Sequence, residues 1–199
     1  MHGTVPNKQP PIHRMKPAAD KLVEAILYLI VQARTRKRDI TQYDILKSLF
    51  LADKSHLNKF GRPITFDNYV AMSNGPVPSF AYEILKNEVD PKKCGVDFFP
   101  WDRAVGEHIN PKAFLFRNPK RTPSEDILSE SDMETLGDAL ATVISLTFGQ
   151  IRTLTHDDIA YKVAWGDGDS SNAPISYGML FDVPDFEEAE HLQFVSQHR

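Results

Sequence analysis

Two consecutive stretches with helical apolar spacing constrain the fold more than any other feature of the sequence. The first begins near Pro17 and ends in a basic cluster, and its apolar residues are Leu22, Ile26, Leu29, Ile30 and Ala33. The second begins at a capping pair, Thr41 with Asp44, and stops at Gly61; its apolar residues are Ile45, Leu46, Leu49, Phe50, Leu57 and Phe60. Residues three and four apart share one face of an α-helix. We therefore expect two amphipathic helices that pack as an antiparallel pair.

The segment after Gly61 changes to a pattern typical of short β-structure. In "RPITFDNYVAM", β-branched and aromatic residues surround a Phe-Asp-Asn turn, which predicts a hairpin or an extended pair. In "SNGPVPS", which follows, each proline fixes its own φ and restricts the residue before it. We expect a third helix to begin at Pro78 or Ser79.

The second half of the chain mixes irregular and helical patterns. Residues 90–124 are the least regular, with short strands predicted in "GVDFFPW" and "AFLFRNP". Helical spacing returns after Ser129 or Ser131, and two short helices follow, with caps predicted at Thr147 with Gln150 and at Thr155 with Asp158. The expected fold class is α+β and mainly α-helical: a single compact helical domain with a small β-hairpin or edge sheet.

Length and composition favour one soluble domain with extensions. We divide the 199 residues into a flexible N-terminal arm (1–16), a domain (17–165) with an irregular insertion at 90–124, and an acidic C-terminal extension (166–199). No apolar run is long enough to span a bilayer, and the single cysteine, Cys94, excludes an internal disulfide. We expect a cytoplasmic protein with no membrane partner.

The charge distribution disfavours nucleic-acid binding. Residues 125–199 hold three basic and fifteen acidic side chains, a net charge of −12. The paired short helices near residues 148–165 resemble a helix-turn-helix in spacing, but Asp157 and Asp158 would face phosphates at the start of the second helix. An operator-binding repressor therefore stays a minor alternative.

No pattern of catalytic residues emerges from the sequence. The strongest candidates for a metal-dependent hydrolase are Asp53, His56 and His156, but their spacing matches no established metal motif. Cys94 lies beside two lysines without an assigned base. We predict no catalytic residue, no metal ligand and no cofactor, and hence a protein that is not an enzyme.

A rigid loop next to aromatic residues is instead typical of a binding surface. A loop that is ordered before binding loses less entropy when it docks, and tyrosines are common interface anchors. The predicted partner-binding residues are Tyr69, Asn74, Gly75, Pro76, Val77, Pro78 and Tyr82.

The string "LFLADKSHLNKFGRPITFDNYVAMSNGPVPSFAYEIL" resembles the central block of the SocA-like, or Panacea, antitoxin domain. The later "LSESDMETLGDAL", "TFGQIRTLTHDD" and "AW" are similar to that family's C-terminal helices, in the same order. The resemblance extends from about Lys21 to Trp165. The sequence departs from the family pattern at Asn74, where an aromatic or basic residue is common.

The resemblance implies an antitoxin that neutralises a cognate toxin by direct protein–protein binding. Such proteins are encoded beside the toxin gene in toxin–antitoxin systems, often on prophages. The alternative implied by one branch is a proteolytic adaptor that delivers the toxin to a protease. A metal-dependent hydrolase and an operator-binding autorepressor are further alternatives.

Overall fold

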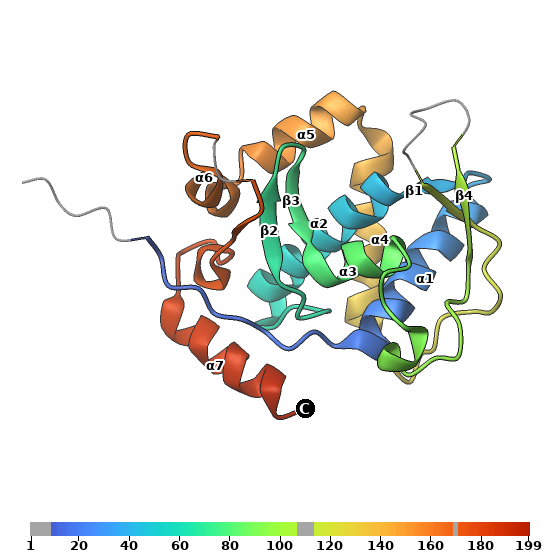
Figure 1. The fold of residues 1–199 in the computed structure, drawn as a ribbon, viewed down its shortest axis with the longest axis horizontal. Helices are drawn as coiled ribbons and strands as arrows, with labels where there is room; N and C mark the ends of the chain where they lie inside the picture. Colours follow the sequence, from blue (N-terminus) through green and yellow to red (C-terminus); the bar gives the residue numbers. More distant parts are fainter. Residues whose placement is uncertain (1–8, 107–113, 169–170) are drawn as a thin grey trace, which may run out of the picture.

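The computed structural model describes residues 9–106, 114–168 and 171–199 (Figure 1). Within these ranges the chain forms seven α-helices: α1 (Ala19–Thr35), α2 (Gln42–Phe60), α3 (Ser79–Leu85), α4 (Glu130–Ser145), α5 (Phe148–His156), α6 (Ile159–Trp165) and α7 (Phe186–Gln197). Its strands are β1 (Ile40–Thr41), β2 (Tyr69–Met72), β3 (Gly75–Pro78), β4 (Asp102–Val105), β5 (Phe114–Arg117) and β6 (Ala173–Pro174). The predicted class, mainly helical α+β, is confirmed.

Helix α2 lies at the centre of the fold. It begins with the predicted capping box, in which Thr41 and Asp44 each accept a backbone N–H bond from the other. It ends at Gly61, whose φ of 74° is left-handed. Its main partner is α4, although we expected α1; α1 contacts both helices. The apolar faces of α1 to α4 form the larger of two hydrophobic clusters.

Two small antiparallel sheets flank the helices. One has the order β3–β2–β6, and the other β1–β5–β4. In the first sheet, Met72 pairs with Gly75, so the hairpin turns at Ser73 and Asn74. The predicted Phe-Asp-Asn turn is wrong, because residues 66–68 form neither a turn nor a strand. Asp67 and Asn68 instead use their side chains to hold other segments in place.

Two further local predictions differ from the structure, and one open alternative is decided. The stretch "GVDFFPW" is no strand: β4 begins at Asp102, immediately after it. Ser129, and not Ser131, caps α4, with Asp132 as its partner. Thr155 is an interior residue of α5 that donates to the Ile151 carbonyl, and Asp158 caps α6 with its own carboxylate.

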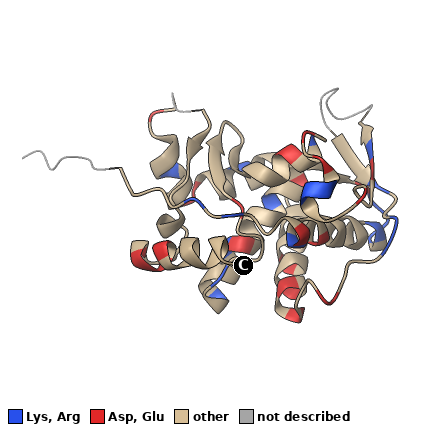
Figure 2. Cartoon of the chain, turned by 60° about the horizontal axis from the view of Figure 1, so that its bottom comes forward, with Lys and Arg blue, Asp and Glu red and all other residues tan. Residues whose placement is uncertain are grey.

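Residues 11–16 lie beside the C-terminal part of the chain on one side of the molecule (Figure 1). The backbone N–H of Lys16 donates to Ser196 Oγ at 3.0 Å, and Ser176 Oγ donates to the Pro11 carbonyl at 2.6 Å. The second hydrophobic cluster lies here, between β2, α6 and α7, and it includes Met15 and Tyr177. Acidic side chains gather at the start of α7 (Figure 2).

None of the helices in the described ranges combines the length and the apolar character that a bilayer crossing demands.

Candidate functional site

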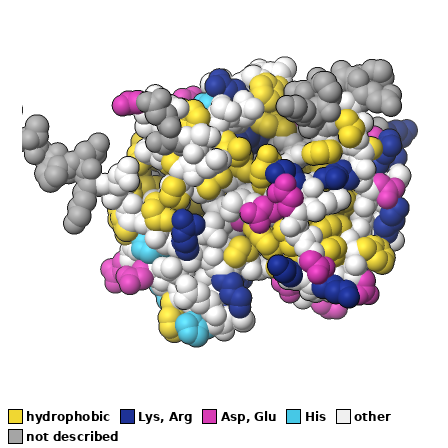
Figure 3. Space-filling view, viewed as in Figure 1, with side chains coloured by type: hydrophobic (Ala, Val, Ile, Leu, Met, Phe, Trp, Pro, Cys, Tyr) yellow, Lys and Arg dark blue, Asp and Glu magenta, His cyan; other side chains and the backbone are white. Residues whose placement is uncertain are grey.

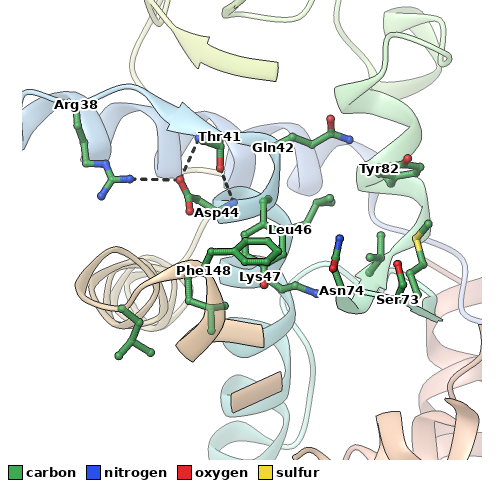
Figure 4. A pocket seen from close by; sticks show the side chains of 15 residues that line it. Arg38, Thr41, Gln42, Asp44, Leu46, Lys47, Ser73, Asn74, Tyr82 and Phe148 are labelled. Carbon is green, nitrogen blue, oxygen red and sulfur yellow. Dashed lines mark hydrogen bonds and ion pairs between the residues drawn. The ribbon is translucent and has the colours of Figure 1, made fainter. Parts of the chain in front are cut away.

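A cleft of about 660 Å³ opens between the start of α2, the β2–β3 hairpin, α3 and the start of α5. Figure 4 shows Phe148 and Asp44 on one side of it and Asn74, Ser73 and Tyr82 on the other. Its lining consists of Arg38, Thr41, Gln42, Tyr43, Asp44, Leu46, Lys47, Met72, Ser73, Asn74, Val77, Tyr82, Leu146, Phe148 and Ile151. Figure 3 shows hydrophobic side chains on this face, between α5 and α3, with basic side chains among them. The cleft therefore combines apolar walls with positive charge.

Lys47 lies at the floor of the cleft and is 1% exposed. Its Nζ donates to the Pro76 carbonyl at 2.8 Å and lies 5.3 Å from the centre of the Tyr43 ring. In the described part of the chain no carboxylate forms an ion pair with it. Burial lowers the pKa of Lys47 to about 7, because an ammonium group is costly to desolvate without a counter-charge.

The hairpin turn presses closely against this lysine. Gly75 has a φ of 101°, and a Cβ there would lie 2.6 Å from Thr155 Oγ1 and 2.8 Å from Lys47 Nζ. Both the conformation and the space therefore require glycine. Arg152 donates to the Ser73 carbonyl at 3.3 Å and ties the turn to α5.

Two polar atoms near the cleft have no hydrogen-bond partner in the part of the chain that the structure describes. They are Tyr43 Oη and His156 Nε2, both buried. Burial and the neighbouring Asp44 raise the pKa of Tyr43 to about 12. Burial, with Arg152 and Lys47 nearby, lowers the pKa of His156. Both groups are therefore neutral at pH 7.

The predicted partner-binding residues lie in three different places. Asn74, Val77 and Tyr82 line the cleft. The other three residues of the loop are buried in strand β3, behind the wall of the cleft: Gly75, Pro76 and Pro78. Tyr69 is 2% exposed and donates its hydroxyl to Asp53 at 2.6 Å, in the second cluster.

Asp53 connects α2 to the segment before β2. Its carboxylate accepts bonds from the backbone N–H groups of Ile64 and Thr65 at 2.8 and 3.0 Å, and also from the Thr65 and Tyr69 hydroxyls. Burial raises its pKa, while these four bonds oppose the shift. Asp53 therefore orders the chain that leads into the hairpin.

Asp67 caps helix α3 from a distance. The residue before the helix is Pro78, which has no side-chain hydrogen bond to offer, and the Asp67 carboxylate instead accepts from Phe80 N at 3.0 Å and Ala81 N at 2.8 Å. Burial raises the pKa of Asp67 to about 7. The "GPVPS" loop is thus held between Lys47, which binds Pro76, and Asp67.

His56 belongs to a third structural network, at the other end of α2. Its Nδ1 donates to the Arg62 carbonyl at 2.8 Å, and its Nε2 lies 3.2 Å from Asp132. Asp132 also pairs with Lys21 at 2.6 Å and Arg62 at 3.1 Å. Burial opposes ionisation of Asp132, but bonds from Lys21 and Ser129 hold its pKa below the usual range. This network joins α1, α2 and α4.

The candidate metal ligands do not form one site. Asp53 and His56 serve the separate networks above, and His156 packs on Tyr161 with ring centres 4.5 Å apart. Across the residues that the structure describes, no group of three or more His, Cys, Asp or Glu side chains lies close enough to hold a metal ion. Burial raises the pKa of Cys94, a buried thiol.

Sequence reasoning missed Lys47 and Phe148, which give the cleft its buried ammonium group and its exposed aromatic ring. Lys47 stands in "DILKSLF", inside an otherwise apolar helical stretch, and a lysine there signals burial only weakly. Phe148 follows the cap Thr147 and is 54% exposed, although the pattern gave no reason to place it at a surface.

Neither the curated proteins nor the solved structures contain a significant match to this chain. A family model does match residues 45–161, with the description "Antitoxin SocA-like, Panacea domain". The matched segment begins at Ile45, within α2, and includes both strands of the hairpin, α3, α4, α5 and the start of α6. It therefore contains the walls of the cleft that the hairpin, α3 and α5 form, whereas the lining residues from Arg38 to Asp44 precede it. Because the match extends over more than half of the chain, this protein belongs to the SocA-like antitoxin family that is defined by the Panacea domain.

Proposed function

We propose that the protein is an antitoxin that neutralises a cognate toxin by direct, stoichiometric binding at the cleft beside the β2–β3 hairpin. The observation that carries this proposal is the cleft itself, where Phe148 is 54% exposed beside the buried Lys47. An exposed aromatic side chain over a preformed cavity is typical of an interface anchor. The hairpin is held from both sides, so it loses little entropy when it docks.

The binding partner is expected to be the product of the neighbouring gene. Mixing the two purified proteins should give one stable complex in size-exclusion chromatography, with one copy of each chain. Co-expression should also rescue a growth arrest that the toxin causes. Separate elution at micromolar concentrations would contradict direct neutralisation.

A variant of the cleft should separate binding from folding. Phe148→Ala removes an exposed ring whose centre is 4.7 Å from that of Tyr43, so the fold should persist while the complex weakens at least tenfold. Val183→Ala is a matched control, because this side chain is 80% exposed and lies outside the cleft. It should bind like the unchanged protein.

The proteolytic-adaptor alternative predicts a different result. Under that mechanism, expression of this protein shortens the half-life of the toxin, and deletion of the protease abolishes the effect. A direct antitoxin leaves the half-life of the toxin unchanged or longer.

A further inference from the structure

The buried polar groups at the cleft have unused hydrogen-bonding capacity. An ammonium group carries three donors, and in the described residues the hydrogen bonds of Lys47 Nζ go to one acceptor, the Pro76 carbonyl. The Tyr43 hydroxyl lacks a partner within the same residues. Buried polar groups in folded proteins are normally bonded, so an acceptor atom of a ligand in the cleft would complete the bonding of Lys47.

The charge around the cleft indicates the sign of that ligand. Lys47 and Arg38 both line it, and Arg152 reaches the neighbouring turn. Asp44 is the acid in the lining, and its carboxylate is already bonded to the Thr41 N–H and lies 3.4 Å from Arg38. The unbalanced charge is therefore positive, and a carboxylate complements it.

The apolar walls indicate what accompanies the carboxylate. Leu146, Phe148 and Ile151 lie on the α4–α5 side of Lys47. Met72, Val77 and Tyr82 lie on the side of the hairpin and α3. A ligand whose acid meets Lys47 would thus have apolar groups on both sides of that acid. An internal segment of a polypeptide fits this arrangement better than a chain end, which has apolar neighbours on one side.

We propose that the cleft binds an internal segment of the partner protein in which an Asp or Glu side chain is flanked by apolar residues, with the carboxylate accepting hydrogen bonds from Lys47 Nζ. This inference rests on the proposed function, because the segment belongs to the toxin. The apolar neighbours of the acid occupy the two walls, and Phe148 covers one of them. Lys47 thereby favours segments with an acidic residue at this position over segments with a neutral one.

Blocked peptides test the inference on the whole protein. The probe is Ac-Leu-Glu-Leu-NH2, and its matched control is Ac-Leu-Gln-Leu-NH2, which has the same size without the charge. Binding is measured by NMR titration of the Met72 methyl group. We expect the glutamate peptide to bind at least fivefold more tightly, and we expect Lys47→Met to abolish that preference. Lys162→Met, a control at a half-exposed lysine of α6, should leave the preference unchanged.

Three results would overturn the inference. They are equal binding of the two peptides, no shift of the Met72 signal with either peptide, and a preference that survives in Lys47→Met. Tighter binding of Ac-Leu-Leu, with its free C-terminal carboxylate, would replace the internal segment by a chain end. A thermal melt of each variant shows that it is folded before binding is measured.

The peptide experiment and the toxin experiment fail independently. If the toxin forms a stable complex but the peptides do not bind, direct neutralisation stands and the acidic segment is rejected. If the glutamate peptide binds but the toxin does not, the cleft recognises acids and direct neutralisation by this protein is rejected.

Discussion

The buried ionisable groups on the two sides of the β2–β3 hairpin differ in how many hydrogen bonds they make. On the side of the second cluster, Asp53 and Asp67 are fully buried, and each accepts at least three hydrogen bonds from fixed donors. On the side of the cleft, Lys47 is equally buried but has the Pro76 carbonyl as its acceptor and lies beside an open cavity. An ionisable group that makes several hydrogen bonds to fixed donors holds segments of the fold together, whereas a buried ammonium group with one acceptor contributes less to stability. This difference predicts opposite effects of mutation on the two sides.

The largest effect is expected at Asp53. Asp53→Ala leaves two backbone N–H groups and the hydroxyls of Thr65 and Tyr69 buried without an acceptor. Orphaned buried donors are costly, so the free energy of unfolding should fall by about 3–5 kcal/mol. Urea denaturation measures this. Tyr69→Phe removes one donor from the same carboxylate and should lower the free energy of unfolding by about 1 kcal/mol. An equal loss of stability in the two variants would mean that the other three hydrogen bonds to Asp53 contribute little.

Asp67 should rank second. Asp67→Ala removes the remote cap of α3 and should lower the free energy of unfolding by about 2–3 kcal/mol.

The pKa of Asp67 is about 7 in the folded state, against 3.8 for an aspartate exposed to water. Between these values the folded state binds more protons than the unfolded state, so stability falls as pH rises. Asp67→Asn should flatten this dependence in urea midpoints measured from pH 4 to 7; an unchanged slope would assign it to another group.

A substitution at Gly75 tests how tightly the turn between β2 and β3 is packed. Gly75→Ala places a Cβ against Thr155 and Lys47 in a left-handed conformation and should cost about 1–3 kcal/mol. The matched control is Gly149→Ala in α5, where a Cβ meets no atom within 4 Å; it should raise stability by about 0.5 kcal/mol. Chemical denaturation of both variants makes the comparison. Equal effects would show that the turn is not tightly packed.

Lys47 should show the smallest effect on stability, with the opposite sign. Lys47→Met removes a buried ammonium at the expense of the bond to Pro76, so stability should stay constant or rise by about 1 kcal/mol. The pKa of Lys47 is about 7 in the folded state, against 10.5 for a lysine exposed to water. Between these values the unfolded state binds more protons, and stability should rise with pH; in Lys47→Met this rise should disappear. A destabilised variant would place Lys47 with the structural charges.

Local patterns allowed much of the fold to be predicted from the sequence. Thr41 with Asp44 and Thr147 with Gln150 form the expected capping boxes, and Gly61 ends α2, because such signals depend on neighbours within four residues. The failures involve distant partners. Asp67 was assigned to a turn, yet it caps a helix that begins twelve residues later.

The site was predicted less completely than the fold. Three of the predicted partner-binding residues, Asn74 and Val77 of the "NGPVPS" loop and Tyr82 of α3, line the cleft. Their role in binding stays a prediction. The sequence could not show that Pro76 and Pro78 face inward, since strand pairing with β2 decides this. Nor could it reveal Lys47, because the burial of one helical lysine depends on α5 and β3, which lie far along the chain.

The contact between Lys16 and Arg199 has a practical consequence for the architecture of larger assemblies. Arg199 donates to the Lys16 carbonyl at 2.8 Å and stacks on Phe66 at 3.8 Å, so residues near both ends are anchored on the side of α7, away from α5 (Figure 1). A fluorescent reporter or a second module attached after Arg199 would therefore project from that side. Docking at the opposite rim would then proceed without steric interference from the attached module.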